Sequence, residues 1–390
     1  KFVGLVRPRV ALLENVSGIL NAFTINESKY YAWFEVTKAF AKEGYIPLCL
    51  KVNAKYVGAA QNRPRFLLIA FREDVYKQFK KNYEKDNPLV QALVESANLT
   101  ISMKKIKVIE KKFANKKISE IEMKSSINKI KPKYGSIKCF DIDKDEALYR
   151  NTILAPFIKQ KAQKNSLNGL ISVKDAIDDL RAESINESLY VKKLNSFFTN
   201  RHKHPLDKFS NHELRQNKNL VRSRFRLYQV LHKVSKEESK EVLMFLKNKN
   251  TPPLLKSTLE SLSKFWFLSL DGKKVSNLSA NQLLELLSEL HTKKHTQKAL
   301  KAQLPAPAAL SIPDDACHYH ESISTQRTLS VREMARIQSF PDWFIVRSKI
   351  TTGGKMRRFE VPQYTQIGNA VPPLLGYSIG VIIRSILELK

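Results

Sequence analysis

The stretch Arg9-Val-Ala-Leu-Leu-Glu14-Asn-Val-Ser-Gly18 decides the fold class. Its four consecutive apolar residues, 10–13, predict a short strand that is buried on both faces of a parallel sheet. The apolar run ends abruptly at Glu14, which places a carboxylate where such a sheet opens. Ligands of open α/β folds bind beyond the carboxyl ends of the strands, so Glu14 is well placed for chemistry.

The residues that follow continue an α/β pattern. Apolar side chains between Tyr30 and Ala41 recur at helical spacing, and Gly44 provides the stop for one amphipathic helix. Residues 45–52 and 66–71 predict two strands, and Pro47 suggests that the first is an edge strand or begins a strand.

A polar loop, Gln61-Asn-Arg63-Pro-Arg65, separates these two strands. In an extended segment, alternate residues point to the same side. The spacing therefore predicts that the guanidinium groups of Arg63 and Arg65 lie together.

The C-terminal segment predicts two helices. Ser330 and Glu333 have the spacing of a capping box, which predicts a helix over 331–339. Residues 374–389 form an almost uniformly apolar run after two prolines, and we expect a buried helix that packs on the N-terminal sheet. The longest apolar stretch, 371–387, is interrupted by two prolines and by Arg384 and falls short of a membrane span, so we predict no membrane partner.

The composition favours a polyanionic partner. The 390 residues include 67 Lys+Arg against 37 Asp+Glu, which gives a formal net charge of +30. The contents of 43% hydrophobic and 27% charged residues exclude a fibre or a disordered tail. Nucleic acid is the first partner to consider, and a lysine-biased composition with solvated faces is the alternative. The densest stretch, 104–138, holds 12 basic and 3 acidic residues, and strands or short helices there fit a solvated face as well as a phosphate track.

The central region has two ambiguous motifs. Arg222-Ser-Arg224-Phe-Arg226 is typical of a DNA-contacting stretch, but residues 220–231 equally fit one amphipathic helix with arginines on its outer face. His202-Lys-His204 and Cys317-His-Tyr-His320 suggest zinc, yet no paired Cys cluster stands at ligand spacing, so we predict no metal site. Three scattered cysteines cannot form a disulfide framework, which favours a reducing compartment.

Four blocks in this order resemble the DNA (cytosine-5)-methyltransferases. They are Glu14-Asn-Val, Gln61-Asn-Arg-Pro-Arg65, the long block from Arg327 to Asp342, and Gln366-Ile-Gly-Asn-Ala-Val-Pro-Pro373. The resemblance implies a Rossmann-like α/β sheet of an S-adenosylmethionine-dependent methyltransferase, incomplete at its N-terminal half, with a large inserted target-recognition region. It implies catalytic residues 1–78, a recognition region over 79–320 and a return to the catalytic domain over 321–390.

The resemblance also assigns site residues. Glu14 matches the carboxyl group that hydrogen-bonds or protonates N3 of a flipped-out cytosine, and Arg65 matches the arginine that contacts its O2. Arg63 matches a position near a backbone phosphate, and Gln61 belongs to the same DNA-binding block. Asn369-Ala370-Val371 matches the block that returns to the S-adenosylmethionine pocket. Arg222 and Arg224 are the central candidates for DNA contact, whereas Arg332 and Glu333 are expected to be structural.

Two parts of the family pattern have no counterpart in these residues. They are the Phe-x-Gly-x-Gly loop for the cofactor and the Pro-Cys-Gln loop that supplies the nucleophile, and none of Cys49, Cys139 and Cys317 takes that role. We therefore expect a fragment that is inactive alone. The expected setting is a bacterial cytoplasmic, nucleoid-associated restriction–modification system with double-stranded DNA as substrate. A cognate endonuclease as a further partner and host modification without a nuclease are equally compatible with the blocks. The alternatives are a non-catalytic DNA-recognition subunit of a split methyltransferase and an inactive relic.

Overall fold

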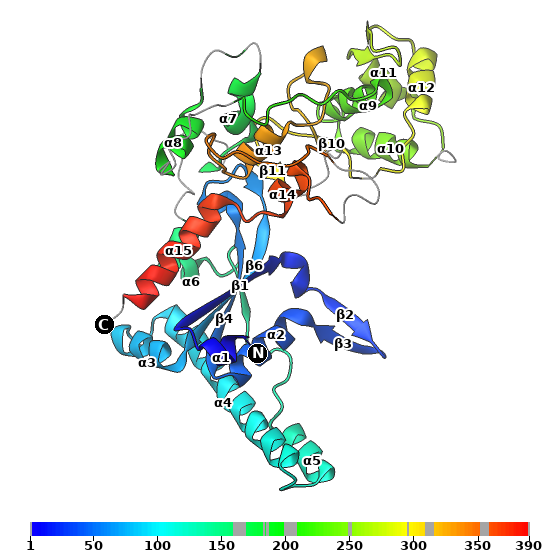
Figure 1. Ribbon diagram of the computed structural model, residues 1–390. Coiled ribbons are helices and arrows are strands. Elements are labelled where there is room, and N and C mark those ends of the chain that lie inside the picture. Colours follow the sequence, from blue (N-terminus) through cyan, green and yellow to red (C-terminus); the bar gives the residue numbers. More distant parts are fainter. Residues whose placement is uncertain are drawn as a thin grey trace. The chain divides into compact units, whose positions relative to one another are not determined.

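The computed structural model in Figure 1 divides into two compact units. It describes residues 2–158, 169–181, 184, 187–198, 209–248, 252–294, 296–308, 316–351 and 359–388. The first unit comprises residues 1–57, 63–161 and 374–390, and the second comprises residues 58–62 and 162–373.

The first unit is a mixed α/β body. Its strands are β1 (Val10–Val16), β2 (Ala22–Ile25), β3 (Ser28–Tyr31), β4 (Tyr45–Asn53), β6 (Pro64–Arg72) and β7 (Cys139–Asp141). Its helices are α1 (Phe2–Val6), α2 (Ala32–Lys42), α3 (Glu73–Asn82), α4 (Pro88–Ala114), α5 (Glu120–Ile130), α6 (Glu146–Arg150) and α15 (Pro373–Leu387), with short 3₁₀ turns at Ser17–Leu20, Ala54–Val57 and Ala155–Phe157.

A four-stranded sheet organises this unit, in the order β1-β6-β4-β7. Strand β6 runs antiparallel to both β1 and β4, while β7 is parallel to β4, so β1, β4 and β7 share one direction. The predicted strands at 45–52 and 66–71 and the helix after Tyr30 are confirmed as β4, β6 and α2. Gly44, with φ of +83°, ends α2 as predicted.

One prediction about strand position is wrong, and another holds only near the start of its strand. Strand β1 lies at the sheet edge with Leu12 40% exposed, so it is not buried on both faces. Strand β4 lies inside the sheet despite Pro47. Proline is tolerated there because β7 pairs only with Cys49–Lys51, which leaves β4 without a described neighbour on that side at Pro47.

Helices cover both faces of the sheet. Alternate residues of β6, such as Phe66 and Leu68, pack with Trp33 of α2 and Leu99 of α4 in one cluster. The residues between them point to the other face. There the ring centroid of Phe71, in β6, lies 6.2 Å from that of Phe79, in α3. Burial on both faces explains why β4 and β6 are almost continuously apolar.

Helices α4 and α5 replace the strands or short helices predicted between 104 and 138. The buried residues of α4 end at Ile106, and α5 has none, so the end of α4 and α5 project from the sheet (Figure 1). The predicted burial of 374–389 is right for one face of α15, which buries Leu375 and Ile382, and wrong for the other, where Tyr377 is 51% exposed. Residues 363–387 are long and apolar enough to cross a membrane by length and composition, so the prediction that this stretch is too short is wrong. An 18-residue window within it is 39% buried inside the protein.

The second unit is mainly helical. Its helices are α7 (Val173–Ile177), α8 (Leu189–Phe197), α9 (Asn219–Val230), α10 (Lys236–Lys247), α11 (Lys256–Ser263), α12 (Ala280–Glu289), α13 (Val331–Ile337) and α14 (Gln363–Asn369), with 3₁₀ turns at Asp178–Leu180 and Ile323–Thr325. Two-residue strands pair β5 (Gln61–Asn62) with β11 (Ala306–Pro307), β8 (Phe267–Leu268) with β9 (Lys274–Val275) and β10 (Lys298–Ala299) with β12 (Ala316–Cys317).

The second unit has two apolar clusters, one around α7, α13 and α14 and one around α9, α10 and α12. The capping box predicted at Ser330 and Glu333 is present, and α13 begins at Val331 as expected. The compact units divide the chain elsewhere than the predicted boundaries after residues 78 and 320. Residues 79–161 belong with the sheet, and residues 321–373 belong with the central region.

Candidate active site

Glu14 and Arg65 form an ion pair on one face of the sheet. Glu14 lies opposite Leu67 and Val16 lies opposite Arg65 in the β1–β6 register, so the two charged residues are diagonal neighbours. Arg65 Nε is 2.8 Å from Glu14 Oε1, and their side chains are 9% and 27% exposed. Glu14 lies within β1 rather than after it, because pairing with β6 continues to Val16.

Arg63 shares the electrostatic environment of this pair. Its backbone N–H donates to Asn53 Oδ1 at 2.9 Å, and its carbonyl accepts from the Ala54 N–H at 3.1 Å. Burial and the nearby Arg65 charge lower the pKa of Arg63 to about 10, and Glu14 opposes that change. Burial also lowers the pKa of Arg65, again against the attraction of Glu14. One carboxylate thus faces two desolvated guanidinium groups.

Gln61 lies in the second unit and is fully buried. Strand β5 pairs in parallel with β11, and Gln61 lies opposite Ala306. Neither polar atom of its side-chain amide has a hydrogen-bond partner among the described residues. A buried amide without a partner costs about 1–3 kcal/mol, so such a group is a candidate for contact with a ligand or an ordered water.

A cavity of about 780 Å³ opens in the first unit, lined by residues that follow β1, by Lys51 of β4 and by residues of β7 and its flanks. Its walls include Ser17 and Asn21 after β1, Lys51 of β4, and Tyr134 and Lys144 on either side of β7. No sequence motif marks this cavity, because its walls come from segments that lie far apart in the chain.

The family model for C-5 cytosine-specific DNA methylases matches residues 1–385. The chain belongs to this family. The mixed α/β architecture agrees with the methyltransferase fold that the four blocks imply.

Several Type II methyltransferases share short regions with this methylase-family chain. M.AplI of Arthrospira platensis is 46% identical over 65 residues, which are 17% of this chain and 16% of that protein. M.DdeI of Desulfomicrobium norvegicum is 51% identical over 53 residues, or 14% of this chain and 12% of that protein. M.AquIB of a Picosynechococcus strain is 41% identical over 54 residues, or 14% of this chain and 39% of that protein. The matched regions thus span well under half of each of these relatives.

The block Asn369-Ala370-Val371 ends α14 in the second unit. Asn369 is exposed, Ala370 is the C-cap residue and Val371 is 37% exposed. These residues do not line the 780 Å³ cavity or a second cavity of about 560 Å³ beside α4. The predicted contact of these residues with S-adenosylmethionine therefore stays a prediction.

The three cysteines of this methylase-family chain are poorly suited to nucleophilic attack. Burial raises the pKa of Cys49, on β4, to about 12, although the Thr37 hydroxyl hydrogen-bonds to the sulfur. Burial also raises the pKa values of Cys139 and Cys317. A nucleophilic cysteine needs a lowered pKa, so none of the three has the environment of an activated thiolate.

The arginines of α9 are less exposed than the sequence suggested. Arg222 donates to Asn219 Oδ1 and to the Ile323 carbonyl, each at 3.2 Å. Arg224 donates to the carbonyls that follow α12 and is half-buried, and Arg226 is buried with an ion pair to Glu321 at 2.9 Å. The amphipathic helix is confirmed, whereas the outward placement of all its arginines is wrong. DNA contact by Arg222 and Arg224 stays a prediction.

No group of three or more potential metal ligands gathers in the part of the chain that the structure describes. His202 and His204 lie outside that part. His318 accepts a hydrogen bond from the His320 N–H at 2.9 Å, so its Nδ1 is engaged within the protein.

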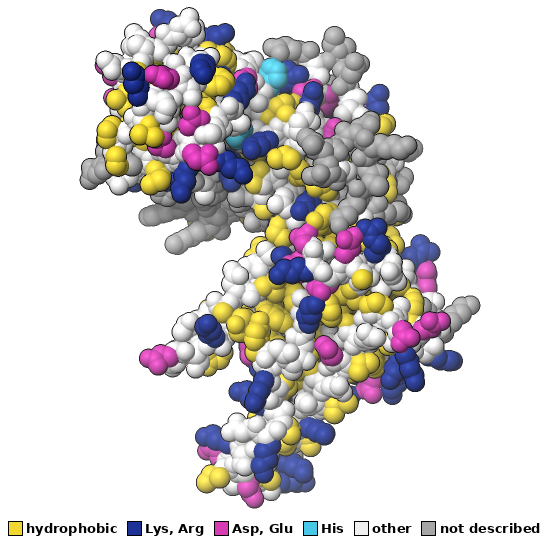
Figure 2. Space-filling view, turned by 180° about the vertical axis from the view of Figure 1, so that it is seen from behind, with side chains coloured by type: hydrophobic (Ala, Val, Ile, Leu, Met, Phe, Trp, Pro, Cys, Tyr) yellow, Lys and Arg dark blue, Asp and Glu magenta, His cyan; other side chains and the backbone are white. Residues whose placement is uncertain are grey.

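The lysine-rich stretch ends at Lys138, directly before β7, but most of it lies on the projecting end of α4 and on α5. Figure 2 shows dark-blue side chains gathered at that end of the molecule. Four of its twelve lysines are ion-paired: Lys104 with Glu73, Lys107 with Glu43, Lys124 with Glu120, and Lys138 with Asp145. The other lysines are exposed. This arrangement is compatible both with a solvated surface and with a row of lysines that binds backbone phosphates.

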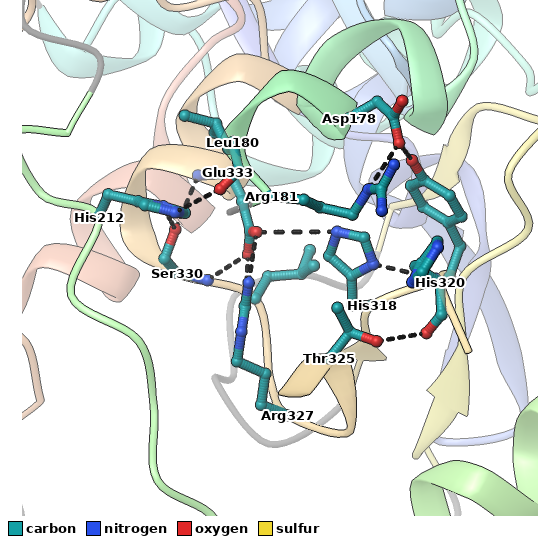
Figure 3. A network of polar contacts seen from close by, with 12 residues as sticks. Asp178, Leu180, Arg181, His212, His318, His320, Thr325, Arg327, Ser330 and Glu333 are labelled. Atoms are coloured by element: carbon teal, nitrogen blue, oxygen red, sulfur yellow. Dashed lines mark hydrogen bonds and ion pairs between the residues drawn. The ribbon is translucent and has the colours of Figure 1, made fainter. Parts of the chain in front are cut away.

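The long family block forms a buried polar network in the second unit (Figure 3). Glu333 accepts two hydrogen bonds from Arg327, both at 2.8 Å, and one from the Ser330 N–H at 2.7 Å. His212 donates to the Leu180 carbonyl and accepts from the Ser330 hydroxyl. Arg332 donates to three backbone carbonyls, at Ser210, Pro341 and Phe344. Arg332 and Glu333 are therefore structural, as expected.

Proposed function

We propose that this chain supplies the base-binding groups for C-5 methylation of cytosine in double-stranded DNA. The observation that carries this proposal is the Glu14–Arg65 ion pair, Nε to Oε1 at 2.8 Å, in a chain of the C-5 cytosine methylase family. The Watson–Crick edge of cytosine presents an amino donor, the N3 acceptor and the O2 acceptor in a row. A carboxyl group beside a guanidinium offers a complementary row to a base that has left the duplex.

Each group has a distinct role in the proposed reaction. Negative charge builds up at N3 when a thiolate adds to C6, so Glu14 stabilises the addition by holding a proton at N3. Arg65 fixes the base through O2 and holds the Glu14 side chain in place. Arg63, which is 3% exposed, reinforces the positive field around the pair, and contact between Arg63 and a phosphate remains part of the proposal.

We infer that the nucleophilic thiolate and the glycine-rich cofactor loop come from polypeptide outside these 390 residues. The raised pKa values of Cys49, Cys139 and Cys317 support this inference. The free edge of β1 supports it as well, because Leu12 and Val16 are 40% and 56% exposed and only β6 pairs with β1 among the described strands. S-adenosylmethionine, the methyl donor used generally in this family, would be bound mainly by that polypeptide.

The first test measures transfer of tritiated methyl groups from S-adenosylmethionine to duplex DNA. We expect no transfer by the 390-residue chain alone and transfer when the polypeptide encoded directly upstream of Lys1 is supplied, in the same chain or separately. Methyl transfer by the isolated chain would contradict the inference about the thiolate. Failure of the completed enzyme would contradict the proposed reaction itself.

The second test is Glu14→Gln in the completed enzyme. Glutamine preserves size but cannot hold or release the proton, so we expect turnover to fall about 100-fold or more, the typical range for loss of a general acid. The dissociation constant for DNA should change less than about threefold. Glu84→Gln, on an exposed loop of the same unit, is the matched control and should change neither quantity. Equal losses of turnover and DNA affinity in Glu14→Gln would contradict the assigned role.

A second candidate is a DNA-recognition subunit that works with a separate catalytic chain. One observation favours it: the aligned 54 residues are 39% of M.AquIB, whereas the aligned 53 and 65 residues are only 12% of M.DdeI and 16% of M.AplI. A much shorter chain can therefore carry this part of the family. A separate upstream reading frame that encodes Pro-Cys-Gln would support this candidate, and an in-frame one would support a single chain. A cognate endonuclease and a cytoplasmic location remain predictions.

A further inference from the structure

The 780 Å³ cavity in the first unit has walls suited to an anionic ligand. Lys51 is ion-paired with Asp141 at 2.7 Å, and Lys138 is ion-paired with Asp145. Asp145 also accepts the Asp141 N–H at 2.8 Å, so the two carboxylates hold these lysines in position. Lys144 lines the same cavity and is exposed, and it forms no side-chain hydrogen bond or ion pair with a described residue. The lining therefore has one uncompensated cation.

An aromatic platform borders the same cavity. The inner face of Tyr134 stacks on Tyr31, with centroids 3.5 Å apart and an interplanar angle of 7°. Trp33 and Phe34 meet the Tyr134 ring edge-on, at 6.1 Å and 5.8 Å. Tyr134 nevertheless remains 52% exposed. A ring that is held from one side and open on the other is suited to stacking with a nucleobase.

The position of the cavity connects it with the base-binding pair. The cavity walls include residues that directly follow β1 and residues that follow β7, two strands that share one direction. Ligands of open α/β sheets bind beyond the carboxyl ends of strands. Its wall at Ser17 and Gly18 directly follows β1, the strand that carries Glu14. A volume of about 780 Å³ is large enough for a nucleotide.

We propose that this cavity binds a nucleotide of the substrate DNA strand other than the target cytosine. The base stacks on Tyr134, and the phosphate binds at Lys144. This assignment rests on DNA being the substrate, but not on the roles of Glu14 and Arg65. Stacking tolerates every base, so the site would add affinity for the strand rather than sequence specificity.

The test uses the whole chain with Trp266 and Trp343 replaced by phenylalanine, which leaves Trp33, in the cavity wall, as the single tryptophan reporter. The probe is a single-stranded thymidine trinucleotide, titrated while Trp33 fluorescence is recorded. We expect saturable binding. Tyr134→Leu should weaken it about tenfold or more, whereas Tyr134→Phe, which keeps the ring, should bind like the parent.

Lys144→Gln should weaken binding several-fold and reduce the salt slope by about 0.7, the value for one lost phosphate contact on a single strand. Lys85→Gln, an exposed lysine elsewhere in the first unit, is the matched control. Circular dichroism should show unchanged folding in all variants.

Several results would overturn the proposal. These are no trinucleotide binding, unchanged affinity in both Tyr134→Leu and Lys144→Gln, or displacement by inorganic phosphate at equal concentration, which would indicate an anion site without a base contact. Methyl transfer by the completed enzyme with no trinucleotide binding would overturn this proposal alone. Trinucleotide binding by Glu14→Gln without methyl transfer would support both proposals separately.

Discussion

Replacing Glu333 with glutamine should unfold the second unit at a much lower urea concentration. The carboxylate is fully buried and accepts two hydrogen bonds from Arg327, which is itself 5% exposed. Glutamine keeps the shape and the capping oxygen, but it leaves the buried guanidinium without a counter-charge. Removing one partner of a buried ion pair typically costs about 3–5 kcal/mol.

The pKa of Glu333 leads to a similar magnitude. Burial alone would raise it, but the hydrogen bonds and charge of Arg327 outweigh burial and lower it from 4.5 to about 2. A difference of that size corresponds to about 3 kcal/mol of stabilisation of the folded state by the ionised carboxylate. This stabilisation is present above pH 4.5 and is lost as the pH falls toward 2.

Urea denaturation of the 390-residue chain measures this effect. A Trp33→Phe background leaves Trp266 and Trp343, both in the second unit, as fluorescence reporters. We expect Glu333→Gln to lower the midpoint by on the order of 1–2 M urea. Glu238→Gln is the matched control, because Glu238 closes an exposed capping box with Ser235 in the same unit and forms no ion pair with an arginine among the described residues. Equal midpoints for the two variants would refute the role of the buried charge pair.

Two further predictions concern titration and thiol chemistry. Burial lowers the pKa of His318 from 6.5 to about 4. As the pH falls, the unfolded chain therefore binds a proton at His318 before the folded chain does. The stability contributed by neutral His318 is complete above pH 6.5 and declines toward pH 4. The urea midpoint of the second unit should fall over that range, with a smaller dependence in His318→Gln; a flat profile in the parent chain would contradict this. Cys49, Cys139 and Cys317 should react with a chromogenic disulfide at pH 8 far more slowly in the native chain than in urea, and fast labelling of any one of them without urea would disprove its protected environment.

The elements with strong local signals were predictable. Strands β4 and β6, helix α2 with its stop at Gly44, and the capping box of α13 follow from short-range periodicity and cap chemistry. The position of β1 at the sheet edge was not predictable, because an apolar run of four residues fits an edge strand as well as a central one. The length of α4 was also underestimated, since its lysine-rich end has no buried face to mark the helical period.

The sequence by itself determined the family, because four motif blocks in one order can be read without any contact being known. It also determined the residue types of the site, Glu14 and Arg65. Only the tertiary structure decided that these two side chains meet at 2.8 Å. Glu14 and Arg65 lie far apart in the sequence, and the β1–β6 register brings them together. The cavity beside Tyr134 and the burial of Glu333 against Arg327 likewise depend on packing between distant segments. Periodicity is encoded within a few residues, whereas register and burial depend on the whole folded chain.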